Sequence, residues 1–183
     1  MISSTETKRS TLNLEKRARA LEQARDTEQQ FRAFAENAPS GIYIYDRHQK
    51  LTYCNEKFLE LIGAPKDIKY EDFDFQDYIM PSDLSSVRDA WKTLLEDHLP
   101  VSHHFRIKMM TQNPDGTSNE LHVSADSYPI LDDQGNVATV QGIMFNISPL
   151  KWAESIQRAR VEEALESKRQ QEHFIDMTSH ELR

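Results

Sequence analysis

The sequence predicts an α+β domain that carries a long helix at each end, and two observations support this. All five glycines and all seven prolines of the 183 residues lie between Pro39 and Pro149. These residues mark turns, and their absence from the flanks permits long helices. Between them, short stretches of alternating apolar residues predict strands. We therefore divide the chain into residues 1–38, 39–148 and 149–183.

The first flank predicts a disordered start followed by a connecting helix over about residues 10–37. A partial heptad repeat runs along it. One row holds Leu14, Leu21, Glu28 and Ala35, and the other holds Arg17, Ala24, Phe31 and Ala38. Since half of these positions suit a coiled-coil core, we expect a coiled coil of moderate strength. Leu21 and Phe31 are the positions at which a charge would test it.

The middle region opens with a predicted hairpin, G-I-Y-I-Y-D (41–46) followed by K-L-T-Y-C-N (50–55). Asn55 can cap a short helix, E-K-F-L-E-L-I, which Gly63 would end. The acidic and aromatic stretch 67–80 predicts short helical turns. A clearer helix follows at 83–97, because its apolar residues recur at helical spacing.

Three more strands are expected after this helix, at 101–109, 121–128 and 137–147. The turn signals N-P-D-G and D-D-Q-G-N separate them. The first and last strands of the region are apolar on both phases, which is typical of strands covered on both faces. One face would meet the domain's own helices, and the other a flanking helix or a second copy of the chain.

The last flank predicts a helix from Ser148 to the end, with Ser148 as N-cap and Pro149 at the first helical position. Its apolar residues do not keep one heptad phase, which weakens a coiled coil locally. Two interpretations stay open: a solvated helix with charge pairs, or a two-helix connector that shifts between packings.

Composition narrows the possible partners and the compartment. The net charge of −8 belongs entirely to the middle region, since both flanks are nearly balanced. Binding of nucleic acid needs a basic face, so we expect none. No apolar run approaches the ~20 residues of a membrane span, and the first ten residues lack the apolar core that a signal peptide has. The single cysteine, Cys54, rules out an intramolecular disulfide and fits a reducing, cytoplasmic location.

The ordered elements resemble a PAS domain over about residues 31–148. The stretches that carry the resemblance are A-E-N-A-P-S-G-I-Y-I-Y-D, Y-C-N-E-K-F-L-E-L-I-G and I-M-F-N-I-S. The resemblance implies a five-stranded antiparallel sheet that cradles short helices over an internal pocket. Asn146-Ile147-Ser148 stands where many PAS domains close with Asp-Ile-Thr, so the carboxylate of that junction is missing here.

The last ten residues, F-I-D-M-T-S-H-E-L-R, resemble the H-box of sensor histidine kinases, with five consecutive matches from Ser179 to Arg183. The resemblance implies that His180 accepts phosphate from ATP and that Glu181 is its acid/base partner. ATP and Mg²⁺ are expected only with a separate kinase domain. Because this chain lacks an ATP-binding domain, we expect it to be inactive alone. A response-regulator receiver domain would take the phosphate.

We expect no metal site and no cofactor in this chain. His103 and His104 are adjacent on a strand and point to opposite faces, so they cannot chelate one ion together. The reactive Asn-Cys-Arg-Phe stretch of flavin-binding PAS relatives is absent, and Cys54 is a small core residue. Haem-binding relatives use a histidine on the long helix, and 83–97 has none. Six aromatic residues could line a ligand pocket or fill the core: Tyr43, Tyr45, Tyr53, Trp91, Phe105 and Phe145.

Two functional hypotheses follow. The favoured one is the sensory and signal-relay region of a two-component histidine kinase, hybrid or not, which works as a parallel homodimer and positions His180. The alternative is a ligand-free dimerisation module that passes on a signal received through residues 10–37. A fully packed interior would favour the alternative. A third reading, a chromophore or haem receptor, is disfavoured by the missing motifs.

Overall fold

The structure, a computed structural model, describes the backbone of residues 4–181 and the side chains of residues 13–175 and 177. Five strands form one antiparallel sheet in the order β2-β1-β5-β4-β3. They are β1 (Gly41–Asp46), β2 (Leu51–Cys54), β3 (Val101–Gln112), β4 (Ser118–Leu131) and β5 (Val137–Asn146). The first and last strands of the sequence order, β1 and β5, lie next to each other in the middle of the sheet.

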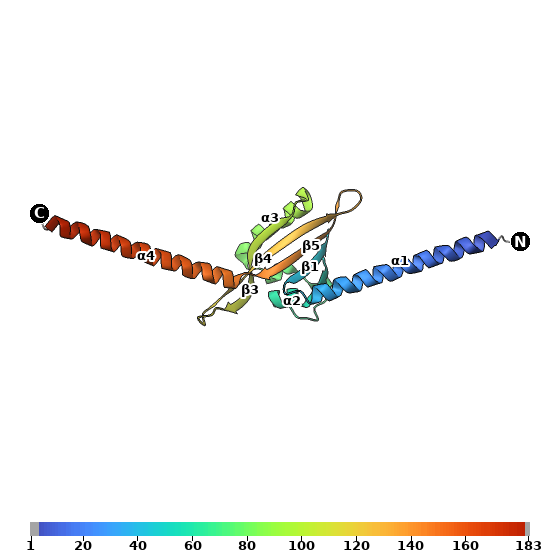
Figure 1. The fold of residues 1–183 in the computed structure, drawn as a ribbon, viewed down its shortest axis with the longest axis horizontal. Coiled ribbons are helices and arrows are strands. Elements are labelled where there is room, and N and C mark those ends of the chain that lie inside the picture. Colours follow the sequence, from blue (N-terminus) through green and yellow to red (C-terminus); the bar gives the residue numbers. More distant parts are fainter. Residues whose placement is uncertain (1–3, 182–183) are drawn as a thin grey trace.

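Four α-helices accompany the sheet. They are α1 (Ser4–Glu36), α2 (Glu56–Ile62), α3 (Leu84–Lys92) and α4 (Ser148–Glu181). Between α2 and β3 the chain also forms three 3₁₀ turns and one π-helical turn: Tyr70–Asp72, Phe75–Tyr78, Pro81–Asp83 and Thr93–Asp97. The long helices α1 and α4 leave the domain in opposite directions, so the whole chain is elongated (Figure 1).

One face of the sheet carries the core. Alternate residues of β1, such as Tyr43 and Tyr45, are buried there, and Val140 and Met144 of β5 join them. Alternate strand residues face one side because side chains repeat every two residues. Helices α2 and α3 and the short turns close over this face, and Phe58 of α2 is fully buried. The apolar spacing of 83–97 thus marks the side of α3 that packs on the sheet.

Asn55 joins the end of α1 to the sheet. Its side chain is fully buried, and its Oδ1 accepts hydrogen bonds from the backbone N–H of Ile42 at 2.8 Å and of Phe58 at 3.0 Å. Its Nδ2 donates to the carbonyls of Ala35 at 2.7 Å and Ser40 at 3.0 Å. The Phe58 bond is the predicted N-cap of α2, and Gly63 ends that helix at φ +74°.

Ser148 makes the equivalent junction at the start of α4. Its Oγ accepts a hydrogen bond from the backbone N–H of His122 on β4 at 2.8 Å, and its own N–H donates to Asn146 Oδ1 at 2.9 Å. Ser148 is therefore the first helical residue and bonds to the sheet, so the expectation that it caps the helix was wrong. The Asn146 amide oxygen thus accepts a hydrogen bond within the turn that leads from β5 into α4.

Several boundaries differ from the sequence-based expectations. Helix α1 begins at Ser4 rather than near residue 10, because no breaker interrupts it, and residues 1–3 lie outside the described part. The helix expected at 83–97 is α-helical only to Lys92 and then becomes a π-turn that ends at His98 with φ +56°. Strands β3 and β4 extend beyond 101–109 and 121–128 into a long hairpin.

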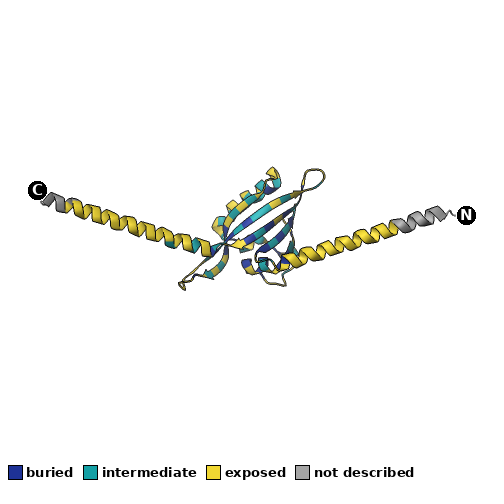
Figure 2. Ribbon diagram, viewed as in Figure 1, coloured by how far each residue is buried: buried dark blue, intermediate teal, exposed yellow. Residues whose placement is uncertain are grey.

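The outer face of the sheet is open within one chain. Ile42, Ile44 and Ile143 are only half-buried there, and Tyr128 and Ile130 remain 51% and 43% exposed. Within one chain, helices therefore cover only the inner face of β1 and β5, and the expected cover of the outer face is not seen. Figure 2 shows that α1 and α4 are exposed along nearly all of their described length.

Candidate functional site: an interior cavity and an adjoining groove

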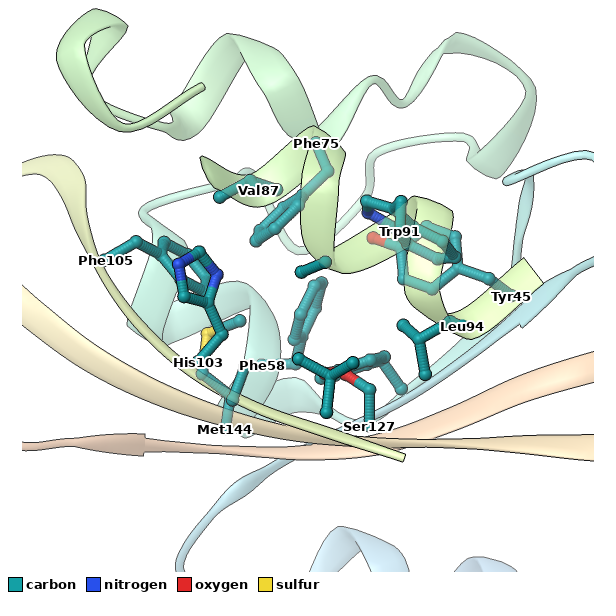
Figure 3. A pocket seen from close by; sticks show the side chains of 14 residues that line it. Tyr45, Phe58, Phe75, Val87, Trp91, Leu94, His103, Phe105, Ser127 and Met144 are labelled. Atoms are coloured by element: carbon teal, nitrogen blue, oxygen red, sulfur yellow. The ribbon is translucent and has the colours of Figure 1, made fainter. Parts of the chain in front are cut away.

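A small aromatic cavity lies between the sheet and helix α3 (Figure 3). Aromatic rings make up much of its wall. Tyr45 meets Trp91 edge to face with ring centroids 5.2 Å apart, and Phe75 meets Phe105 in the same way at 5.8 Å. Such contacts are favourable beyond the area they bury. The β1 and β3 strands and α3 thus converge on one rigid interior.

Four polar side chains line this interior, and they differ in their hydrogen bonds. The hydroxyls of Tyr43 and Ser127 share a hydrogen bond of 2.7 Å, and burial raises the pKa of Tyr43 to about 12. Burial also lowers the pKa of His103, which favours its neutral ring. The hydroxyl of Tyr45 is buried and has no hydrogen-bond partner among the described residues. Burial raises the pKa of Tyr45 as well.

The cavity is small. Its volume is about 40 Å³, which is room for a few water molecules at most. Pockets that enclose drug-sized ligands measure about 300–1,000 Å³. Side chains therefore fill most of the interior, and a water molecule is one candidate partner for the Tyr45 hydroxyl.

A second, larger hollow adjoins the cavity on the outer side of Tyr45. This groove has a volume of about 290 Å³ and runs between the β1–β2 turn, the 73–76 segment and α3. Its apolar wall comes from side chains that also face the core: Tyr45, Phe73, Phe75, Leu84, Val87 and Trp91. Its polar rim comes from His48, Gln49, Lys50, Asp74, Gln76 and Arg88.

Four of the six aromatic residues named from the sequence line the cavity, namely Tyr43, Tyr45, Trp91 and Phe105. The other two lie elsewhere. Tyr53 donates a hydrogen bond to Glu36 Oε1 at 3.1 Å, and Phe145 lies on the outer face of the sheet. His103 lines the cavity while its neighbour His104 is exposed, as strand alternation predicts.

Sequence reasoning missed other lining residues. Phe58 and Met144 also line the cavity. The apolar residues of α2 were a signal for Phe58, and the apolar run of β5 was a signal for Met144. Phe75 had no such signal, because it sits in an irregular acidic stretch. Cys54 is buried as expected, with its Sγ 3.7 Å from the Tyr70 hydroxyl, and burial raises its pKa.

The expected phosphoacceptor site cannot be described in the same detail. The backbone of His180 and Glu181 continues helix α4, but their side chains lie outside the described residues, as do Leu182 and Arg183 altogether. The roles of His180 and Glu181 therefore stay predictions. Within the described part of the chain, no group of three or more potential metal ligands occurs, and no helix is long and apolar enough to cross a membrane.

Comparisons with known proteins agree with this architecture. Residues 29–97 match the family model of a PAS domain. No curated protein sequence matches the chain. Among solved structures, a sensory box histidine kinase/response regulator from Burkholderia thailandensis E264 superposes with a TM-score of 0.53 at 16% identity, covering 75% of this chain and 98% of that one.

Two further structures share the fold. A PAS domain from Colwellia psychrerythraea has a TM-score of 0.50 at 14% identity, covering 67% of this chain and 98% of that one. The LOV protein of Rhodobacter sphaeroides has a TM-score of 0.51 at 12% identity, covering 68% of each chain. At these identities the likeness concerns the fold alone. Together with the family match over residues 29–97 and the sheet order, it shows that the region between the two long helices has the PAS fold.

Proposed function

We propose that this chain is the PAS sensory and signal-relay region of a two-component histidine kinase. In this proposal, α4 carries the signal from the PAS domain to the phosphoacceptor His180, with Glu181 as its acid/base partner, in the cytoplasm. The observation that carries it is the placement of α4. The helix starts at a buried, hydrogen-bonded junction with the sheet and runs without a break into the Ser-His-Glu-Leu-Arg stretch.

The two junctions support a relay role. Asn55 fixes the end of α1 to β1 and α2, and Ser148 fixes the start of α4 to β4. A movement of the sheet would therefore be transmitted to both helices. A signal can shift their packing only if it binds one arrangement more tightly than the other.

The proposal includes a parallel homodimer that pairs through α1 and the outer face of the sheet. Phe34 of α1 is 73% exposed, and Phe31 borders the same open surface as Ile42 and Ile44. A second copy of the chain would bury both. Phe31 also packs against its own Tyr53, with ring centroids 5.5 Å apart, so Phe34 is the cleaner position for a test.

Dimerisation is tested by sedimentation of the full chain. Phe34→Asp should dissociate the dimer and leave the PAS domain folded, because within one chain this side chain is exposed. Phe174→Asp, which puts the same charge on the far part of α4, shows whether that helix contributes separately. A wild-type chain that sediments as a monomer at 100 μM would contradict the dimer.

The phosphoacceptor is tested in a chimera. The chain is joined at Arg183 to the remaining dimerisation and ATP-binding regions of a characterised histidine kinase. Acid-labile phosphate from labelled ATP should appear on the chimera and disappear with His180→Gln, whereas His173→Gln on the same helix should retain it. Equal labelling of the His180→Gln protein would show that another residue accepts the phosphate.

Relay through α4 is tested separately by inserting residues after Glu166. Seven inserted residues preserve the heptad phase, whereas four rotate it by about 50° in the heptad frame and break the seam. The labelling rate should be close to wild type after seven and clearly altered after four. An equal rate in both would mean that α4 is only a tether.

A ligand-free relay module remains the second candidate, and the packed interior favours it. With about 40 Å³ left, the cavity as it stands holds little besides water. In that case the signal would enter through α1. Asn55→Ala should then make the phosphate-labelling rate of the chimera independent of changes in α1, while His180 is still phosphorylated.

A further inference from the structure

We propose that the groove beside Tyr45 binds a small amphipathic carboxylate, with its acid group at Lys50 and Arg88 and its apolar end against Trp91 and Phe75. This proposal deepens the sensory function proposed above and rests on it. It concerns the groove of about 290 Å³ between the β1–β2 turn and α3, which is large enough for a small molecule, and not the much smaller cavity behind it.

The charge of the rim points to an anion. Neither the ammonium of Lys50 nor the guanidinium of Arg88 has an ion-pair or side-chain hydrogen-bond partner among the described residues. Asp74 is the acidic residue of the lining, and its Oδ1 already accepts a hydrogen bond from the N–H of Gln76 at 2.9 Å. His48 adds an imidazole to the same rim.

This basic rim contrasts with the rest of the domain. The region between the flanks holds nine basic and seventeen acidic residues, so its general field repels anions. Lys50 and Arg88 nevertheless line the same groove, and cations on a groove wall raise the local concentration of anions. Arginine in particular matches a carboxylate with two parallel hydrogen bonds.

The wall of the groove indicates a flat apolar body. Trp91 and Arg88 lie three residues apart on α3 and so share one face of the helix. Phe73 and Phe75 come from the opposite wall. A ligand whose acid group reaches Arg88 can therefore place a ring against Trp91. Aromatic faces of this kind can stack against a planar group whatever polar atoms that group carries.

Tyr45 supplies an independent observation. Its side chain is only 3% exposed, its hydroxyl has no partner among the described residues, and it borders the groove and the cavity alike. Figure 3 shows its ring extending from the strand towards Trp91. A buried hydroxyl without a partner is destabilising, and native structures satisfy nearly all of them. A polar atom of the ligand would satisfy it from the groove side.

Calorimetric titration of the full chain tests the proposal with a matched pair of probes, 3-phenylpropionate and its neutral amide. The acid should bind at least about tenfold more tightly than the amide, since only the acid can form charge-assisted bonds. Its affinity should also fall with added salt. Equal binding of the two probes, or no binding of either at 10 mM, would overturn the proposal without requiring any variant.

Variants locate the site. The double change Lys50→Gln/Arg88→Gln should weaken binding of the acid by about tenfold or more. The control Lys57→Gln/Lys92→Gln removes the same charge outside the groove and should change the affinity less than twofold. Tyr45→Phe should weaken it by about fivefold, the equivalent of one hydrogen bond. An unchanged affinity in the first double variant would refute the assignment to this groove.

Trp91 gives a second readout. In a Trp152→Phe background it is the sole tryptophan of the chain, so its fluorescence should change on addition of the acid and follow the calorimetric curve. A calorimetric signal with no change at Trp91 would place the ligand elsewhere. Failure of these binding tests leaves the α4 insertion experiment unaffected, so the ligand and the relay can fail separately.

Discussion

Replacing Asn55 with alanine should destabilise the PAS domain by about 3 kcal/mol. Loss of the N-cap bond to Phe58 contributes about 1 kcal/mol. The change also leaves the part-buried N–H of Ile42 and the buried carbonyl of Ser40 without this partner, at about 1 kcal/mol each. The Ala35 carbonyl is less affected, because it also accepts from the N–H of Ala38 at 3.2 Å.

Urea denaturation followed by circular dichroism at 222 nm measures this loss as a shift of the midpoint at constant slope. The matched control is Asn37→Ala. The Asn37 side chain is exposed and donates to the Ala33 carbonyl within α1, so its removal should cost less than about 0.5 kcal/mol. A loss below about 1 kcal/mol for Asn55→Ala would refute the account of this junction.

Three further outcomes are expected. Gly142→Ala should cost about 2 kcal/mol in urea denaturation, because the added Cβ would lie 2.3 Å from the Tyr43 ring, and a cost below about 0.5 kcal/mol would contradict that packing. The melting temperature should fall as the pH drops from 7 to 5. Burial lowers the pKa of His103, so the histidine binds a proton more readily in the unfolded chain than in the folded one. His103→Gln should make this fall smaller. Hydrogen bonds from Arg106 hold the pKa of Asp83 at about 2. The stability that these bonds contribute is therefore present above the unfolded pKa of 3.8 and is lost as the pH falls towards 2. If Arg106→Gln left the loss of stability at acid pH unchanged, this pair would be excluded as its cause.

Local signals predicted much of the fold. Asn55 and Gly63 marked both ends of α2, and the N-P-D-G and D-D-Q-G-N stretches marked the turns between the last three strands. These features depend on backbone conformations that particular residues prefer, so a single sequence reveals them. The five-stranded antiparallel sheet was expected from the ordered set of PAS-like motifs, and the structure confirms it.

Features that depend on distant partners were not predictable in this way. Nothing in the sequence indicated that Ser148 would bond to His122, 26 positions earlier, instead of capping its own helix. The outer groove was also missed, because Lys50, Asp74 and Arg88 come together only when the β1–β2 turn folds against α3. The partnerless hydroxyl of Tyr45 is likewise a property of the packed core.

Helix α4 is long enough to amplify a small tilt at its start. It has 34 residues, so it spans about 50 Å from Ser148 at a rise of 1.5 Å per residue. A tilt of only about 5° at the sheet junction would displace the far end of such a rod by about 4 Å. A displacement of that size exceeds the length of a hydrogen bond, which is about 3 Å. Rearrangements too small to repack the core could therefore decide whether a group at the end of α4 is within reach of an enzyme.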